Sequence, residues 1–257
     1  MVAVFAARGW ARFPADPALA RWTAAALPAA LLALAAGAEP LRCGGTWDVG
    51  LDALPNDAAG AVGGVPLAGA AIDAVETLTG RLPLHRAQLS TVYPGYPRPW
   101  AEESDAAFRY RLTRDSAHVD GLLPVGPDRR RMIREPHAWI LGLPLTRTGP
   151  GASPPAVWEG SHRIMARAFS EALAGHPTAC WAEVDVTDAY HAARREAFAT
   201  CERVVLDAGP GEAVLIHRLA LHGISPWAEG AEAPPEGRII AYFRPELPGG
   251  IADWLKV

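Results

Sequence analysis

His118 and Asp120 carry side chains that can bind a metal ion, and a single residue separates them in the stretch Ser-Ala-His-Val-Asp-Gly-Leu. Side chains alternate along an extended segment, so these two point to the same side of the chain. An imidazole and a carboxylate placed in this way can take adjacent coordination positions on one divalent metal ion. A His-x-Asp pair also occurs by chance, so the prediction of a metal site depends on further ligands.

A third ligand would close one triangular face of the metal and leave the opposite face open to other molecules. We predict that this ligand is His222, far along the chain in Leu-Ala-Leu-His-Gly, with His217 as the alternative. Arg238 could bind an anion, because a guanidinium in a pocket can hold a carboxylate through two parallel hydrogen bonds. Such an arginine would suit an acidic cosubstrate that chelates the metal with its other end.

The elements expected to position these residues are mostly short strands. From residue 83 onward, apolar runs alternate with loops rich in Pro, Gly and charge. Two helical stretches, 163–174 and 187–201, interrupt them. Many short strands without a βαβ rhythm predict a mainly β fold with flanking helices, a sandwich or jelly roll. The predicted strands are 84–93, 107–112, 137–146, 156–158, 203–206, 213–217 and 238–243.

The first part of the chain has a helical pattern. Residues 1–14 predict a short strand and turn. Asp16 is then a plausible helix N-cap with Pro17 in the first turn, for a helix reaching about Ala36. A second helix is expected over 67–78, ending at Gly80. With no clear linker in the sequence, we expect one domain over 1–257 with an N-terminal helical layer over about 1–80.

Composition narrows the function classes. The 257 residues are 50% hydrophobic and carry a formal net charge of −4, which argues against a nucleic-acid partner. Three widely spaced cysteines form no disulfide framework and favour a reducing compartment. The uncharged segment 22–38 contains Pro28 and is shorter than the ~20 apolar residues of a spanning helix. We therefore expect a cytoplasmic protein that does not bind a membrane. The basic run 129–134 predicts a solvated loop, with anion recognition as the alternative.

Several stretches resemble, in the expected order, the phytanoyl-CoA dioxygenase-like group of iron(II)- and 2-oxoglutarate-dependent oxygenases. They are the opening Gly9-Trp-Ala-Arg-Phe-Pro, His118-Val-Asp, Val157-Trp-Glu-Gly-Ser-His-Arg, Leu221-His-Gly and the strand that Arg238 opens. Three features depart from the pattern. Glu159 replaces the usual proline before Gly-Ser-His-Arg. A longer gap after His222 leaves Arg244 as a second candidate for the cosubstrate arginine. Residues 40–80 match nothing in the group and are candidates for substrate selection.

The resemblance implies a double-stranded β-helix (jelly roll) with iron(II) at its mouth, bound by His118, Asp120 and His222. It implies that Arg238 holds 2-oxoglutarate and that O2 is consumed to hydroxylate a small-molecule substrate. Related halogenases have a small residue in place of the aspartate, so Asp120 favours hydroxylation. We expect a monomer or weak homodimer. The alternatives are a jelly-roll protein that binds a metal or ligand without catalysis, and a cupin-like metalloenzyme, although the remaining histidines do not cluster in the sequence.

Overall fold

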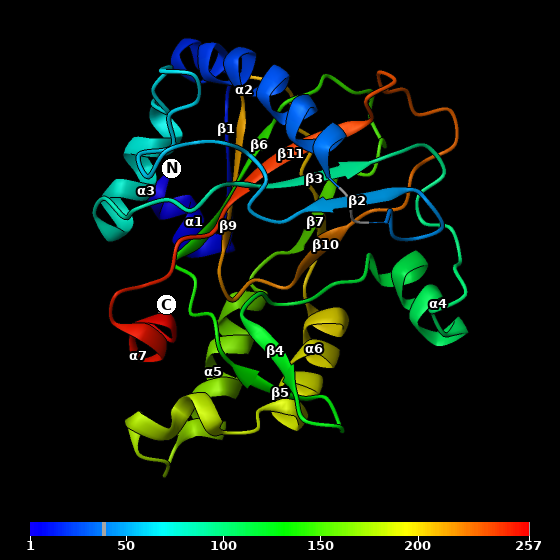
Figure 1. Cartoon of the computed structure of the whole chain (residues 1–257). Coiled ribbons are helices and arrows are strands. Elements are labelled where there is room, and N and C mark those ends of the chain that lie inside the picture. Colours follow the sequence, from blue (N-terminus) through cyan, green and yellow to red (C-terminus); the bar gives the residue numbers. More distant parts are fainter. Residues whose placement is uncertain (38–39, 257) are drawn as a thin grey trace.

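The computed structural model describes residues 1–37 and 40–256, and it contains a six-stranded antiparallel main sheet (Figure 1). Neighbouring strands of this sheet pair antiparallel throughout. The strand order is β1 (Trp10–Phe13), β9 (Ala213–His217), β6 (Trp139–Pro144), β11 (Arg238–Phe243), β3 (Gln88–Val92) and β2 (Trp47–Gly50).

A second antiparallel sheet contains β10 (His222–Ile224), β7 (Pro155–Trp158) and β8 (Arg203–Val205). His118 forms a β-bridge with His222 and so extends this sheet at the β10 edge. From β3 to β11 the chain passes repeatedly between the two sheets, which is the winding of a jelly roll. The expected fold class is therefore confirmed. The hairpin of β4 (Leu122–Val125) and β5 (Arg130–Ile133) is separate from both sheets.

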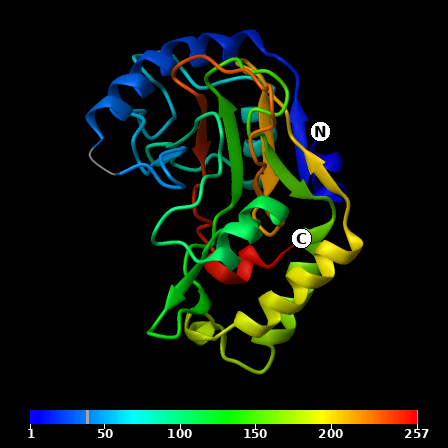
Figure 2. The same ribbon diagram turned by 90° about the vertical axis from the view of Figure 1, so that its right-hand side faces the viewer.

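Helix α2 (Pro17–Ala36) covers the outer face of the main sheet, at one end of the molecule in Figures 1 and 2. Asp16 begins it as predicted, since its Oδ1 accepts hydrogen bonds from the amides of Ala18 and Leu19. Trp22 is fully buried, and its ring lies 6.1 Å from that of Phe243 on β11. α1 (Val2–Arg8) and α3 (Ala70–Thr79) contribute buried side chains to the same core.

α2 is long enough, and with a mean hydropathy of 1.5 apolar enough, to span a membrane. Core helices of other proteins and signal sequences can have the same length and hydropathy. Along one side of α2, the side chains of Leu19, Trp22, Ala26 and Ala30 are buried in the core. Only 28% of the most apolar 18-residue window of α2 is buried, so packing of this side accounts for part of the apolar sequence. The last residue of the predicted segment 22–38 lies outside the described residues.

A second helical group lies at the opposite end of the molecule (Figures 1 and 2). It comprises α5 (Ser161–Leu173), η1 (Thr178–Glu183), α6 (Thr187–Thr200) and α7 (Gly250–Trp254). Phe169, Tyr190 and Trp254 are buried together at its centre, and the ring of Phe169 stacks on both other rings. The predicted helices over 163–174 and 187–201 are confirmed as α5 and α6.

Three predictions of secondary structure are wrong. The basic run 129–134 was expected to be a solvated loop, but Arg130–Ile133 form strand β5 in a hairpin with β4. Residues 107–112 form part of α4 (Asp105–Arg114), because the Ser104 hydroxyl caps the amide of Ala107 and starts a helix. None of the α4 residues is fully buried, so the alternation of aromatic and charged residues reflects no sheet face. Residues 1–14 contain α1 before strand β1, where a strand and turn were expected; Gly9 ends α1 with φ 82°.

Candidate metal centre

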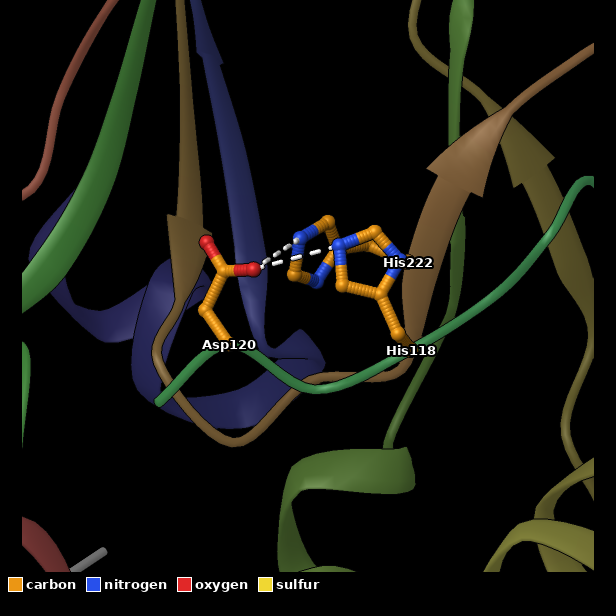
Figure 3. A group of neighbouring side chains, drawn as sticks. All are labelled: His118, Asp120 and His222. Atoms are coloured by element: carbon orange, nitrogen blue, oxygen red, sulfur yellow. Dashed lines mark ion pairs between the residues drawn. The ribbon is translucent and has the colours of Figure 1, made fainter. Parts of the chain in front are cut away.

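The side chains of His118, Asp120 and His222 meet at one point, with candidate ligand atoms all within 4.8 Å of one another (Figure 3). The Asp120 Oδ1 lies 3.1 Å from the Nε2 of His118 and 3.8 Å from the Nε2 of His222. The His118 side chain is half exposed, whereas those of Asp120 and His222 are 10% and 12% exposed. The structure thus brings together the three residues that the sequence suggested as ligands.

The backbone fixes the two histidines relative to each other. The His118 amide donates to the His222 carbonyl at 2.8 Å, and the His222 amide donates to the His118 carbonyl at 3.0 Å. Residues that exchange both hydrogen bonds in this way lie directly opposite each other in an antiparallel pair. Their imidazole centroids are 4.7 Å apart, and Asp120, two residues after His118, projects toward them.

Hydrogen bonds at the far side of each ring determine which nitrogen is free. His118 Nδ1 contacts the Ser116 carbonyl at 3.0 Å, and His222 Nδ1 contacts the Ala220 carbonyl at 2.9 Å. A carbonyl only accepts, so each Nδ1 is the donor and each Nε2 of a neutral ring presents a lone pair toward Asp120. In the protonated ring of His118, the same Nε2 instead donates to Asp120 Oδ1 at 3.1 Å. Three electron-pair donors that converge in this way fit a divalent cation, and carbonyl partners commonly orient metal-binding histidines.

The electrostatics of the three groups are coupled. Burial would raise the pKa of Asp120, but the hydrogen bond from His118 and the charges of His222, His118 and Arg244 hold it well below its usual range. Burial lowers the pKa of His222 to about 4, with the Asp120 charge opposing this shift. Burial also lowers the pKa of His118, but the hydrogen bond and charge of Asp120 outweigh it and the pKa is raised. The carboxylate is therefore ionised and His222 neutral at neutral pH, which are the forms that bind a metal.

Arg244 holds the second oxygen of the candidate ligand. Its Nη1 donates to Asp120 Oδ2 at 3.0 Å, and its Nη2 donates to the Gln88 Oε1 on β3 at 2.6 Å. The Oδ1 atom therefore faces the histidines while Oδ2 is occupied. Arg244 was the second candidate for the cosubstrate arginine, and the structure shows it engaged with Asp120.

Arg238 has a different environment. It is 4% exposed on β11, and none of its guanidinium nitrogens has a hydrogen-bond acceptor among the described residues. Burial lowers its pKa, which the nearby hydroxyls of Tyr242 and Tyr96 oppose. The Tyr96 hydroxyl is likewise buried, with no hydrogen-bond partner in the described part of the chain. A buried cation without a counter-charge is costly, so this arrangement fits an anionic ligand.

A cavity of about 340 Å³, here called the main cavity, adjoins the three residues. Arg238 itself lines a small cavity of about 20 Å³, and Tyr242 lines both. Trp47, Val49 and Leu51 on and after β2 also line the main cavity. Part of the stretch 40–80, which matched nothing in the sequence, therefore lies beside the candidate metal centre. The other residues that line the main cavity include Ser90, Tyr96, Arg111, Ile140, Ile216 and Ile224.

Two glycines allow the close packing around these residues. Gly121 has φ 86°, and a Cβ there would lie 2.2 Å from the Glu135 carbonyl oxygen. A Cβ at Gly223 would lie 2.2 Å from the Asp115 carbonyl oxygen. Each glycine directly follows a candidate ligand, so the backbone approaches its neighbour where a side chain would push it away.

The other histidines suggested by the sequence lie elsewhere. His217 is buried on β9, its Nδ1 accepts a hydrogen bond from the Leu219 amide, and its ring lies 4.8 Å from that of His162.

Ser161, the residue before His162, has a structural role that the sequence did not reveal. The Ser161 hydroxyl donates to the Trp158 carbonyl and accepts from the Leu221 amide at 2.8 Å. The Gly-Ser-His-Arg turn is therefore bonded to the residue before His222.

Comparison with known proteins supports the fold. No family model matches the chain, and no curated protein matches it significantly. The structure of SnoK, a non-heme alpha ketoglutarate dependent carbocyclase from nogalamycin biosynthesis, matches with a TM-score of 0.51 at 11% identity, covering 95% of this chain and 81% of SnoK. AviO1 from Streptomyces viridochromogenes Tue57 matches with a TM-score of 0.51 at 17% identity, covering 97% of this chain and 94% of AviO1. The chain thus has the fold of a non-haem iron and 2-oxoglutarate-dependent enzyme.

Proposed function

We propose that the protein is an iron(II)- and 2-oxoglutarate-dependent oxygenase that hydroxylates a small-molecule substrate. His118, Asp120 and His222 are the proposed metal ligands. Two imidazoles and one carboxylate on one face of a metal are the ligand set of non-haem iron(II) oxygenases, and they leave coordination positions free. When bound, iron(II) with 2-oxoglutarate supplies the oxidation of a C–H bond by O2.

The observation that carries the proposal is the unpartnered guanidinium of Arg238. Metal-binding triads occur in many hydrolytic and structural sites, so the triad alone does not select this reaction. A buried arginine without a partner among the described residues, in a cavity that shares Tyr242 with the main cavity, suits an acidic cosubstrate. In our proposal Arg238 holds the distal carboxylate of 2-oxoglutarate, assisted by the hydroxyls of Tyr242 and Tyr96. Arg244 instead orients Asp120, because both of its terminal nitrogens are already hydrogen-bonded.

The chain contributes binding, orientation and exclusion of water. The Nδ1 hydrogen bonds of His118 and His222 keep both Nε2 lone pairs directed at the metal position. The inner wall beside the centre is apolar, with Ile140 and Ile216 from the main sheet and Ile224 from β10. Such a wall limits the access of bulk water to the reacting carbon. We expect a cytoplasmic protein that acts as a monomer or weak homodimer.

Anaerobic titration of the full chain with iron(II) and then 2-oxoglutarate tests this proposal. The expected result is a visible metal-to-ligand charge-transfer band and, on admission of O2, formation of succinate. His118→Ala should abolish both signals. His176→Ala is the matched control, because His176 is exposed and remote from the three ligands in the sequence. Tight metal binding with neither a band nor succinate would instead indicate a non-catalytic metal-binding protein.

A further inference from the structure

A second cavity, of about 480 Å³, reaches His118 and Asp120 from the side of α4 and α6, and we call it the side cavity. Both cavities share Ser116, His118, Asp120, Glu135 and Arg244, whereas Tyr96 and Tyr242 line only the main cavity of the two. The wall of the side cavity includes two aromatic residues and four basic ones: Tyr110, Tyr190, Arg131, His191, Arg194 and Arg244.

Arg194 is the first basic group of this wall without a counter-ion. Its guanidinium carbon lies 4.9 Å from the ring centroid of Tyr110 and 5.3 Å from that of Tyr190. Among the described residues it forms no ion pair within 4.0 Å. Stacking between two aromatic rings fixes a guanidinium in place while leaving its edge N–H groups available.

Arg131 is the second such group. Its neighbours in the basic run have acidic partners: Arg130 binds Asp185, and Arg134 binds Glu183. By contrast, the only side-chain hydrogen bond of Arg131 in the described chain goes from Nη1 to the Leu122 carbonyl at 3.3 Å. Two of the four arginines in the run are therefore paired, and Arg131 is the one of the four that lines the side cavity.

The side-cavity wall also carries two acidic groups, Asp120 and Glu135. Asp120 bonds Arg244 and faces the histidines. Glu135 lies 3.3 Å from the His137 imidazole, but burial lowers the pKa of His137, so Glu135 is a carboxylate on this wall without a cationic partner among the described residues. Burial lowers the pKa of His191, and the charges of Arg194, Arg131 and Arg195 lower it further, with Asp188 opposing them.

The basic wall is also close to the proposed metal ligands. The Tyr110 hydroxyl donates to the Ala117 carbonyl at 2.6 Å, and Ala117 directly precedes His118. Because Arg194 stacks on the same Tyr110 ring, its guanidinium is held beside the segment that carries His118 and Asp120. A small molecule bound at Arg194 would have its carbon skeleton within the same cavity as these ligands.

We propose that Arg131 and Arg194 bind an oxyanion of the substrate, so that the substrate of this oxygenase is a small molecule bearing a carboxylate or phosphate group. The statement that this molecule is oxidised rests on the proposed function. The binding of an oxyanion is argued separately, from the residues of the side cavity. Paired guanidinium groups recognise planar carboxylates and phosphates through charge-assisted, bidentate hydrogen bonds. 2-Oxoglutarate then occupies the Arg238 side, and the substrate approaches from the Arg194 side.

Calorimetric titration of the metal-free full chain with inorganic phosphate, and separately with acetate, tests the site. We expect at least one probe to bind, and the tighter one identifies the substrate's anionic group. The single changes Arg131→Gln and Arg194→Gln should each weaken binding about tenfold, the loss expected for a charge-assisted hydrogen bond. Arg194→Lys, which keeps the charge, should retain part of the affinity. Arg21→Gln on the exposed side of α2, at the opposite end of the molecule, is the matched control and should bind like the unchanged protein.

The same variants separate this inference from the proposed function. Arg131→Gln and Arg194→Gln should still give the charge-transfer band with iron(II) and 2-oxoglutarate. Equal binding of both probes to all variants, or no binding to the unchanged protein, would overturn the oxyanion site even if the band is present. Binding that the two changes weaken, in a protein without any band, would support the oxyanion site and contradict the oxygenase.

Discussion

At the scale of single residues, Arg238 combines a cost in stability with a proposed benefit in binding. Its guanidinium is buried and has no acceptor among the residues described here. Arg238→Met removes the buried charge and keeps much of the side-chain volume. We expect the free energy of unfolding in urea to rise by about 1 kcal/mol or more, because an apolar side chain replaces an uncompensated ion. We expect 2-oxoglutarate affinity, followed by the iron(II) charge-transfer band, to fall about a hundredfold.

Arg12→Gln is a suitable control for this substitution. Arg12 binds Glu212, and its side chain is 47% exposed, so its loss should change neither cosubstrate affinity nor stability appreciably. A clear loss of stability in Arg238→Met with unchanged 2-oxoglutarate affinity would mean that Arg238 is a structural residue.

Residue types and spacing in the sequence suggested the three residues that meet in the structure, with His217 left open as an alternative third ligand. His118 and Asp120 followed from the alternation of an extended segment, and His222 was preferred because Leu-His-Gly resembles the family pattern. The contact of Arg244 with Asp120 could not be predicted, since it depends on which strands are neighbours. Arg244 follows β11, which pairs with β3, and this pairing brings Gln88 and Asp120 within its reach.

At the scale of elements, the turn from β7 into α5 supports the third ligand. Ser161→Ala leaves the buried amide of Leu221 without its acceptor, so we expect the free energy of unfolding to fall by about 1–3 kcal/mol. Because Leu221 precedes His222, we also expect the affinity for Mn(II), measured by calorimetry, to fall. Ser170→Ala on the exposed side of α5 is the control and should change neither quantity. Weaker folding with unchanged Mn(II) affinity would show that the turn does not position His222.

The elements that the sequence predicted well are those in which local signals and burial agree. α2 begins at an Asp-Pro cap and buries one side, and β9 is an apolar run that is buried throughout. α4 was mistaken for a strand because Phe108, Tyr110 and Leu112 alternate with charged residues. The Ser104 cap outweighs that alternation where no sheet is present to bury one face. The order of the strands and the contact between the two sheets depend on which distant segments pair with each other. The periodicity of apolar residues along one sequence does not predict that pairing.

At the scale of the molecule, a metal ion should stabilise the whole fold. The proposed ligands come from two segments that the second sheet joins, and the unfolded chain would hold them far apart. Mn(II) at a hundred times its dissociation constant should raise the free energy of unfolding by about 2.7 kcal/mol. This corresponds to a rise in melting temperature of about 5–10 °C for a chain of this size. Differential scanning calorimetry measures it, and the same rise in His222→Ala would contradict the proposed centre.

The glycines at 121 and 223 have a consequence for recognising related chains. Each follows a proposed ligand and lies where a methyl group would collide with a backbone carbonyl. A distant relative that retains the two histidines and the aspartate but carries a larger residue at either place must have a wider separation between those backbones. The string His-x-Asp-Gly followed, after a long interval, by His-Gly is therefore a compact signature for this particular geometry, one that overall identity as low as 11% would conceal.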